Sequence, residues 1–347
     1  MDFLNIGRLH EVRGSNFEMG YEHGAIFGSK IKSMVDELLQ KCSRIEGVTK
    51  DSIYRMTEKY VPFIEKDAPH IIEEMRGIAE GSNVSYYDIL FVNLRHEILN
   101  GLIRARDDCT VVGVEPSRSS TGNLMVAQNV DQPGSFAGMM QTLKMRPNDG
   151  PSMLVHLLPG NVGQHGINAY GLVRASNGLK STDEATLGLP RVILNRLILE
   201  QKNVDDAVEL ISNSRRTVSS NYVLGDSSGR LVSIESTAHE CRIILPTNGA
   251  IVHANNILHP DIRDLDARET TDSPKRYESM KRIVFSHAYK VNINDLCSWL
   301  RDHTNYPESI CNHSTSITVA SIIYLPMEQE LRVAGGNPCV NEYLEYS

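Results

Sequence analysis

Residues 104–113, with the sequence Arg104-Ala-Arg-Asp-Asp-Cys-Thr-Val-Val-Gly113, separate two parts of the chain that differ in pattern. Before them, residues 16–101 space their apolar side chains three and four positions apart, as amphipathic helices do. After them come short apolar runs bounded by Gly, Asn, Asp and Pro, which is typical of strands. Because helical patterns recur between these strands, at 190–201, 204–212 and 273–288, the sequence predicts a layered α+β fold.

Composition narrows the class of protein. The chain has 347 residues, 41% of them apolar, which is enough for a large core. Its 35 Lys and Arg against 43 Asp and Glu give a net charge of −8, which argues against a nucleic-acid partner. No window approaches eighteen uncharged apolar residues, and the first residues carry charges where a signal peptide is apolar, so we expect a cytoplasmic protein without a membrane segment.

Two helix starts can be predicted from capping residues. Asn203 precedes the helical pattern at 204–212 and is a favourable N-cap. Ser273 is followed by Pro274, which is common at the first helical position, so we expect Ser273 to cap the next helix.

Several motifs do not support a cofactor or metal. The stretch PGNVGQHG (159–166) spaces its glycines as G-x-x-G-x-x-G and lacks a surrounding βαβ unit. Both features disfavour a nucleotide-binding site. Four possible zinc ligands follow one another at spacings of six, eight and two residues: Cys297, His303, Cys311 and His313. These spacings do not fit the paired ligands of structural zinc sites. The chain is too long to need disulfides, so we expect its six cysteines to be free thiols. Since neither motif supports a nucleotide or a metal, we expect no cofactor.

Cys109 begins the first expected strand, and two interpretations are open. It is either a buried core cysteine, as free cysteines commonly are, or a nucleophile. The second is favoured by strings that occur in order along nearly the whole chain: GSNFEMGYEHG (14–24), NLRHE (93–97), DCT (108–110), QNVD (128–131), GINAYGL (166–172), Asn177, Asn221 with Tyr222, Glu235, HAN (253–255), SPKR (273–276), Asp302 with His303, SICNH (309–313) and GNPC (336–339).

With these strings the chain resembles the autoproteolytic, peptidase C45-like acyltransferase and hydrolase family that includes the fungal acyl-CoA:6-aminopenicillanic acid acyltransferase. The resemblance implies an N-terminal-nucleophile (Ntn) hydrolase fold, an αββα sandwich with an α-rich N-terminal segment. It also implies a zymogen in which Cys109 attacks the carbonyl carbon of Asp108 and cuts the chain. Residues 1–108 would then form a helical small chain, and residues 109–347 the catalytic core, held together as a heterodimer. Many relatives have Gly before the cysteine, so Asp108 is a departure that affects the rate of maturation.

The resemblance also implies roles for four other residues. Asp131 would hold the new α-amino group of Cys109, which serves as the base for its own thiol. Asn255, and Asn177 with it, would donate N–H groups to the oxyanion. Arg276 would favour the thiolate and order Asp131. Ordinary structural roles are the alternative: a turn for Asp131, Asn255 and Asn177, and a solvated helix face for Arg276.

The expected activity is acyl transfer through a thioester on Cys109. A small N-acyl amide or acyl thioester would supply the acyl group, and water or an amine would accept it. We expect an amidohydrolase first and a coenzyme A-dependent acyltransferase second, with coenzyme A only as a carrier of the substrate. A third alternative is an uncleaved binding protein on the same fold.

Overall fold

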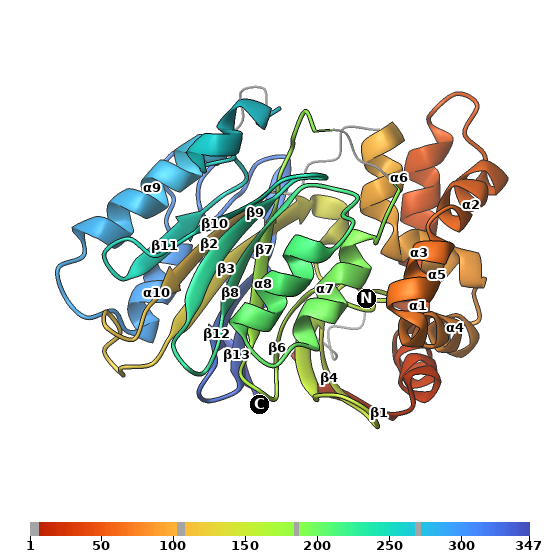
Figure 1. Cartoon of the computed structure of the whole chain (residues 1–347), viewed down its shortest axis with the longest axis horizontal. Coiled ribbons are helices and arrows are strands. Elements are labelled where there is room, and N and C mark those ends of the chain that lie inside the picture. The colour runs from red at the N-terminus through yellow and green to blue at the C-terminus, as the bar shows by residue number, and fades with distance from the viewer. Residues whose placement is uncertain (1–6, 103–107, 184–186, 268–271) are drawn as a thin grey trace.

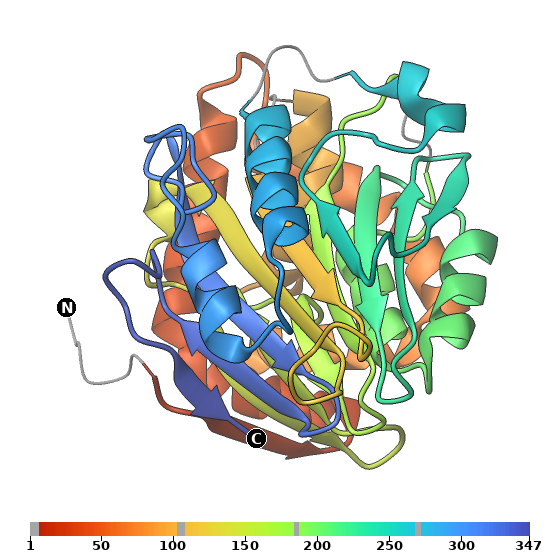
Figure 2. The same cartoon turned by 90° about the vertical axis from the view of Figure 1, so that its left-hand side faces the viewer.

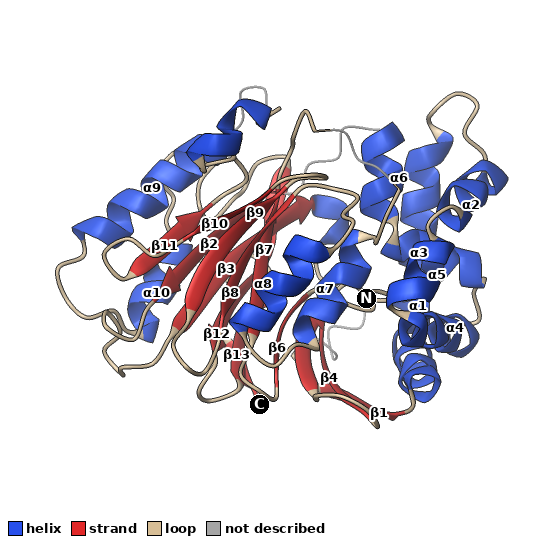
Figure 3. Cartoon of the chain, viewed as in Figure 1, coloured by secondary structure: helices blue, strands red, loops and turns tan. Residues whose placement is uncertain are grey.

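The computed structural model describes residues 7–102, 108–183, 187–267 and 272–347. Two β-sheets stack face to face, and helices cover both outer faces (Figures 1 and 3). Contacts between the sheets include the position of Gly113, where a Cβ would lie 2.8 Å from Leu231. The predicted α+β class and αββα layering are therefore confirmed.

The strands fall into two groups. The eight-stranded sheet has the order β1 (His10–Gly14), β4 (Gln141–Pro147), β5 (Met153–Leu157), β6 (His165–Asn168), β7 (Val173–Gly178), β8 (Ser220–Gly225), β9 (Leu231–Ser236) and β10 (Cys241–Ile244). The six-stranded sheet has the order β11 (Ala250–His253), β2 (Asp108–Val114), β3 (Met125–Pro133), β12 (Ser316–Leu325), β13 (Glu330–Ala334) and β14 (Leu344–Tyr346).

The helices form two layers. The six-stranded sheet is covered by α9 (Ser273–Ser286) and α10 (Ile293–Leu300), which Figure 2 shows in blue in front of its strands. Against the eight-stranded sheet lie α7 (Arg191–Leu199) and α8 (Val204–Asn213), with the N-terminal helices beside them (Figure 1). The N-terminal helices are α1 (Asn16–Ser43), α2 (Lys50–Glu58), α3 (Val61–Asp67), α4 (Pro69–Ser82), α5 (Tyr86–Asn93) and α6 (Arg95–Leu102). Short 3₁₀ helices occur at Gly134–Phe136 and Pro260–Leu265.

The N-terminal part contains a strand that precedes the helices predicted within residues 16–101. His10–Gly14 forms β1, which pairs in parallel with β4 along five residues at the edge of the eight-stranded sheet. Val12 is the one fully buried residue of this strand, and its polar neighbours Glu11 and Arg13 are exposed. An alternation of apolar and polar residues over only five positions is too short to identify a strand from the sequence. The division of the chain at residue 108 stays a prediction.

Helices α1 and α4 are in close backbone contact. A Cβ at Gly20 would lie 2.1 Å from the carbonyl oxygen of Glu74, and one at Gly77 would lie 2.1 Å from that of Phe17. Only glycine permits two helices to approach this closely. The two helices therefore pack backbone against backbone.

Alternation along β2 decides which side each site residue faces. Val111 belongs to the large core that fills the space between the sheets, whereas Val112 packs in the second core, beneath α9 and α10. Successive side chains of a strand point to opposite faces. Cys109 therefore shares the inter-sheet face with Val111, and Asp108 and Thr110 share the face that α9 covers.

Among the residues that the structure describes, none of the helices combines the length and the hydropathy required to cross a bilayer.

Candidate active site

Cys109 is the second residue of β2, and its side chain is 4% exposed. It lies opposite Val130 of β3, and both line a polar pocket to which α6 contributes Arg95 and His96. The other lining residues are Gln132, Gln164, His165, Arg174, Ser176, Arg191, Val192 and Asn195. The cavity of about 20 Å³ has room for a water molecule beside the sulfur.

The main chain of Cys109 is held at both ends by two side chains. Its N–H donates a hydrogen bond to Asn255 Oδ1 at 2.8 Å, and its carbonyl oxygen accepts one from Arg276 Nη1 at 2.7 Å. Arg276 Nη2 also donates to Asn255 Oδ1 at 3.1 Å. The structure thus brings together three of the residues predicted from the sequence.

Local structure explains why these side chains meet. Strand β11 runs antiparallel to β2, with His253 opposite Val111, so Asn255 follows β11 at the start of β2. Arg276 lies in the first turn of α9. The predicted cap of this helix is wrong: its N-cap is Asp272, and Ser273 is the first helical residue. The Ser273 hydroxyl instead accepts the N–H of Asn255 at 2.7 Å, so it positions the site.

Arg276 is a fully buried cation among carboxylates. Its Nη2 lies 3.4 Å from Asp108 Oδ1, its Nε lies 3.5 Å from Asp272 Oδ2, and Nη1 donates to Thr110 Oγ1 at 2.9 Å. Burial opposes the charged guanidinium, but Asp108, Asp131 and Asp272 together raise the pKa of Arg276. The site therefore holds a permanent positive charge next to the Asp108–Cys109 peptide.

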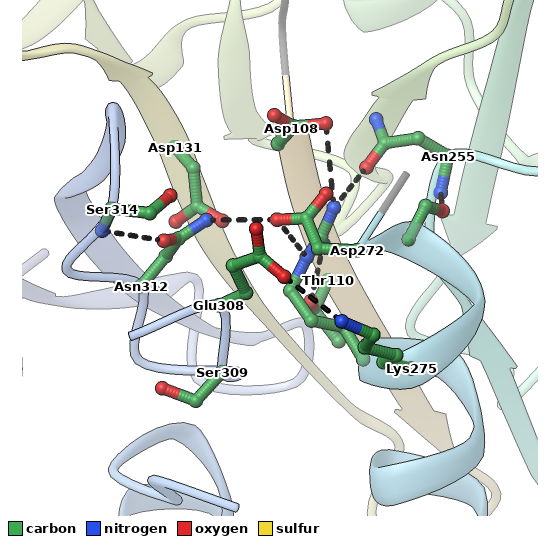
Figure 4. A network of polar contacts seen from close by, with 12 residues as sticks. Asp108, Thr110, Asp131, Asn255, Asp272, Lys275, Glu308, Ser309, Asn312 and Ser314 are labelled. Carbon is green, nitrogen blue, oxygen red and sulfur yellow. Dashed lines mark hydrogen bonds and ion pairs between the residues drawn. The ribbon is translucent and has the colours of Figure 1, made fainter. Parts of the chain in front are cut away.

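Asp131 lies on β3 directly opposite Asp108 (Figure 4). It is fully buried, and its Oδ1 accepts a hydrogen bond from Thr318 Oγ1 at 2.7 Å. Among the residues that the structure describes, Oδ2 has no hydrogen-bond partner. Burial raises the pKa of Asp131 to about 7, although the charge of Arg276 and the Thr318 hydroxyl act in the opposite direction. Asp131 can therefore hold or release a proton near neutral pH.

The two asparagines differ in their available hydrogen-bond donors. Asn255 Nδ2 donates to the carbonyl oxygen of Gly178 at 3.0 Å. Asn177, on β7, accepts a hydrogen bond from Asn221 Nδ2 at 3.2 Å through its Oδ1, while its own buried Nδ2 has no partner within the described parts of the chain. In this state Asn177 has the unused amide donor, and Asn255 acts as an acceptor for Cys109. Their catalytic roles stay predictions.

Sequence reasoning missed the residues that connect the site to the neighbouring loop. Asn312 Nδ2 lies 3.4 Å from Asp272 Oδ2 (Figure 4). The Asn312 N–H donates to Thr318 Oγ1 at 2.9 Å. Glu235 accepts hydrogen bonds from the N–H groups of Leu258 and His259 and pairs with buried His253, so it fixes the segment around Asn255. Three of these residues, Asn312, Glu235 and His253, were among the strings that carry the resemblance, but no spacing in the sequence gives their contacts.

Comparison with known families and curated proteins gives consistent matches. Residues 118–339, more than half of the chain, match the family described as Acyl-coenzyme A:6-aminopenicillanic acid acyl-transferase. The chain is 25% identical over 338 residues to the Acyl-coenzyme A:6-aminopenicillanic-acid-acyltransferase 40 kDa form of Emericella nidulans, covering 94% of this chain and 92% of that protein. An uncharacterized protein of Archaeoglobus fulgidus is 24% identical over 319 residues, which cover 82% of this chain and 50% of that protein.

Two solved structures align with this chain at low identity. Penicillin V acylase from Agrobacterium tumefaciens aligns with a TM-score of 0.44 and 13% identity, covering 65% of this chain and 83% of that chain. A mutant of conjugated bile acid hydrolase from Clostridium perfringens aligns with a TM-score of 0.44 and 11% identity, covering 69% of this chain and 96% of that chain.

Proposed function

The chain belongs to the acyl-coenzyme A:6-aminopenicillanic acid acyl-transferase family, and from this premise we propose that it is a self-cleaving cysteine N-terminal-nucleophile enzyme. It would hydrolyse or transfer the acyl group of a small N-acyl amide through a thioester on Cys109. Membership makes it an enzyme of acyl transfer or amide hydrolysis. The cysteine nucleophile, the self-cleavage and the substrate are our proposal.

One observation carries the proposal, namely the contacts of the Cys109 main-chain nitrogen. Cleavage before Cys109 would turn this nitrogen into an α-amino group, and it already donates to Asn255 Oδ1 at 2.8 Å. On the neighbouring strand, Asp131 has an unpartnered buried carboxyl oxygen opposite Asp108. A core cysteine needs neither an Asn–Arg pair on its backbone nor a buried aspartate without a full set of hydrogen bonds, since such groups cost stability.

Maturation would follow from this geometry in two steps. Cys109 Sγ adds to the carbonyl carbon of Asp108, and the C–N bond breaks as the nitrogen takes up the thiol proton, which leaves a thioester and a free amine. Water then hydrolyses the thioester to give a new main-chain α-carboxylate on Asp108 and the Cys109 thiol. The ion pair between Arg276 and Asp108 holds the residue before the scissile bond in place and offsets its negative charge. This contact supports cleavage despite the bulkier residue at position 108.

Turnover would use the amine that cleavage creates. An α-amino group has a reference pKa of about 7.7–8.0 and can take the thiol proton near neutral pH. The thiolate adds to the acyl carbon of the substrate, and the oxyanion accepts a hydrogen bond from Asn177 Nδ2, the unused buried donor. The substrate C–N bond then breaks with proton transfer from the ammonium of Cys109, and water or another amine releases the acyl group from sulfur.

A second candidate is an acyltransferase that takes its acyl group from coenzyme A. The name of the Emericella nidulans relative, which covers nearly the whole chain, favours it. Both candidates use the same thioester on Cys109 and differ only in acyl donor and acceptor. Steady-state assays with N-acyl amides and with acyl-coenzyme A plus an amine acceptor distinguish them.

Residues 1–108 are proposed to stay bound as the small chain after cleavage. The pairing of β1 with β4 and the helix layer support this, because both would lose buried contacts on separation.

Mass spectrometry with N-terminal sequencing tests the proposal. In proportion to length, the 38.7 kDa chain should divide into fragments of about 12 and about 27 kDa, the larger beginning with Cys109. Cys109→Ala should abolish cleavage and turnover, Cys109→Ser should cleave slowly and lose turnover, and Cys241→Ala, on β10 far from the pocket lining, should do neither. A wild-type chain that turns over acyl amides while remaining uncut would refute the mechanism. An uncut, inactive chain would favour the binding-protein alternative.

A further inference from the structure

Four metal-ligating side chains converge on one side of the active-site network, and we call them the His/Cys cluster: His303, Cys311, His313 and Cys339. Their ligand atoms all lie within 4.8 Å of one another. His303 follows α10, Cys311 and His313 precede β12, and Cys339 lies between β13 and β14. Three separate segments therefore build this cluster, and the proposed acyl-transfer chemistry uses none of it.

The three distances from His313 Nε2 to the other ligand atoms are close to those of a tetrahedral zinc site. His303 Nε2 and His313 Nε2 are 3.1 Å apart, and His313 Nε2 is 3.4 Å from Cys311 Sγ and 3.5 Å from Cys339 Sγ. Zinc bonds of about 2.0–2.1 Å to nitrogen and about 2.3 Å to sulfur, at tetrahedral angles, place two nitrogens about 3.3 Å apart and a nitrogen and a sulfur about 3.6 Å apart. Because all four ligand atoms lie within 4.8 Å of one another, they are close enough together to be shared by one ion.

The chemistry of the donors selects the metal. Two imidazoles and two thiols without a carboxylate form a Cys₂His₂ set, which suits zinc and disfavours magnesium or calcium. Asn337 Nδ2 lies 3.5 Å from Cys311 Sγ while also donating to the carbonyl oxygen of Asn312 at 2.8 Å, so an N–H group supports the sulfur as a thiolate. Four protein ligands leave no open position, which indicates a structural and not a catalytic ion.

Backbone hydrogen bonds fix the ligands before any ion binds. The N–H of Cys311 donates to the carbonyl oxygen of Asp302 at 3.0 Å, and the N–H of His313 donates to that of Pro307 at 2.9 Å. Cys311 and Cys339 are free thiols. The site is therefore preorganised, and binding would displace the two thiol protons.

The cluster is connected to the active site through one residue. Asn312 lies between two of the ligands in sequence, and it contacts Asp272, which pairs with Arg276 (Figure 4). Its N–H also donates to the Thr318 hydroxyl that bonds Asp131. An ion that holds both neighbours of Asn312 would keep these contacts in register.

We propose that His303, Cys311, His313 and Cys339 bind one structural zinc ion that holds the loop of Asn312 against Asp272 and Asp131. Spacing in the sequence argued against zinc because Cys339 comes from another segment and Cys297, the residue first considered, lies outside the cluster. The proposal is independent of whether Cys109 is the nucleophile.

Metal analysis of the full-length chain tests it. Protein produced with zinc in the medium and dialysed without chelator should contain about one zinc per chain by plasma mass spectrometry. Cobalt(II) added to the stripped protein should give the d–d absorption of a tetrahedral site and a thiolate-to-cobalt charge-transfer band. Cys339→Ser and His303→Gln should lower the zinc content to below half, whereas the matched control Cys297→Ser, on α10, should keep it.

The wild-type result decides the matter even if a variant fails to fold. Half a zinc per chain or more, with the tetrahedral cobalt spectrum, supports the site. Less than half a zinc, or an octahedral cobalt spectrum, overturns it. A mass 2 Da below that of the reduced chain, assigned by peptide mapping to a Cys311–Cys339 disulfide, would also overturn it, because the two sulfurs would then be a redox pair.

Discussion

Replacing Asp131 with asparagine is expected to stabilise the uncut protein at alkaline pH while impairing its chemistry. The carboxyl group is fully buried, and burial raises its pKa from 3.8 to about 7. Between these pH values the folded protein keeps the proton that the unfolded chain has released, so the free energy of unfolding falls as pH rises. Stability from this group is complete below about pH 4 and lost above about pH 7. An asparagine does not titrate and escapes this loss.

The size of the effect follows from the shift. At 1.36 kcal/mol for each pKa unit, the raised pKa of Asp131 lowers the free energy of unfolding, relative to its value at low pH, by about 4 kcal/mol at pH 8 and by about 1.5 kcal/mol at pH 5. The stability difference between Asp131→Asn and the parent should therefore grow by about 3 kcal/mol from pH 5 to pH 8. Asparagine can keep the Thr318 hydrogen bond through its Oδ1, and its amide nitrogen takes the place of the unpartnered Oδ2.

Urea unfolding followed by circular dichroism measures this difference. Both chains should carry Cys109→Ala, so that every molecule is uncut and the transition involves one species. Asp226→Asn is the matched control, because Asp226 is also buried but accepts hydrogen bonds from the N–H groups of Val204 and Ser228. In Asp226→Asn the side-chain amide nitrogen would face one of these N–H donors, so the free energy of unfolding of this variant should fall by about 1–3 kcal/mol at pH 8.

One result would refute this reasoning. If Asp131→Asn destabilises the protein by the same amount at pH 5 and pH 8, then Arg276 keeps the carboxylate ionised throughout and the raised pKa is wrong. In the chain that retains Cys109, the same substitution should lower turnover by about a hundredfold, because the α-amino group loses its carboxylate partner.

Two other substitutions give direct tests. Asn255→Ala removes the acceptor of the Cys109 N–H and of Arg276 Nη2, and should lower cleavage and turnover by at least about tenfold while the circular dichroism spectrum is kept; unchanged rates would exclude Asn255 from the site. Gly20→Ala inserts a methyl group 2.1 Å from a carbonyl oxygen of α4 and should cost about 1–3 kcal/mol in urea unfolding. Gly28→Ala, where the nearest atom is 3.5 Å away, should instead stabilise by up to about 1 kcal/mol, and equal effects of the two would show that α1 and α4 are not in close contact.

Local patterns predicted much of the fold. The helical periodicity before residue 102 and the strand at Cys109 are both observed, and Asn203 caps α8 by accepting the N–H of Asp206. The prediction for Ser273 failed because its hydroxyl bonds Asn255, a partner that is eighteen positions away. Capping preferences describe a few neighbouring residues and carry no information about such distant partners.

The site was harder to predict because its contacts depend on strand register. Resemblance placed Asp131 and Arg276 near Cys109, but the position of Asp131 opposite Asp108 follows from the pairing of β2 with β3. A shift of one residue would turn Asp131 to the other face of the sheet. The fourth member of the His/Cys cluster, Cys339, reaches the others only through the turn after β13.

The parallel pairing of β1 with β4 has a consequence for how the protein can be produced. Five residues from the N-terminal part occupy the outer edge of the eight-stranded sheet. Without them, β4 would present a row of open N–H and C=O groups, and such an edge is a template for aggregation. Residues 109–347 produced alone, even after removal of an added initiator methionine to expose Cys109, should therefore be insoluble. The small chain would thus be required for the large chain to fold into soluble protein.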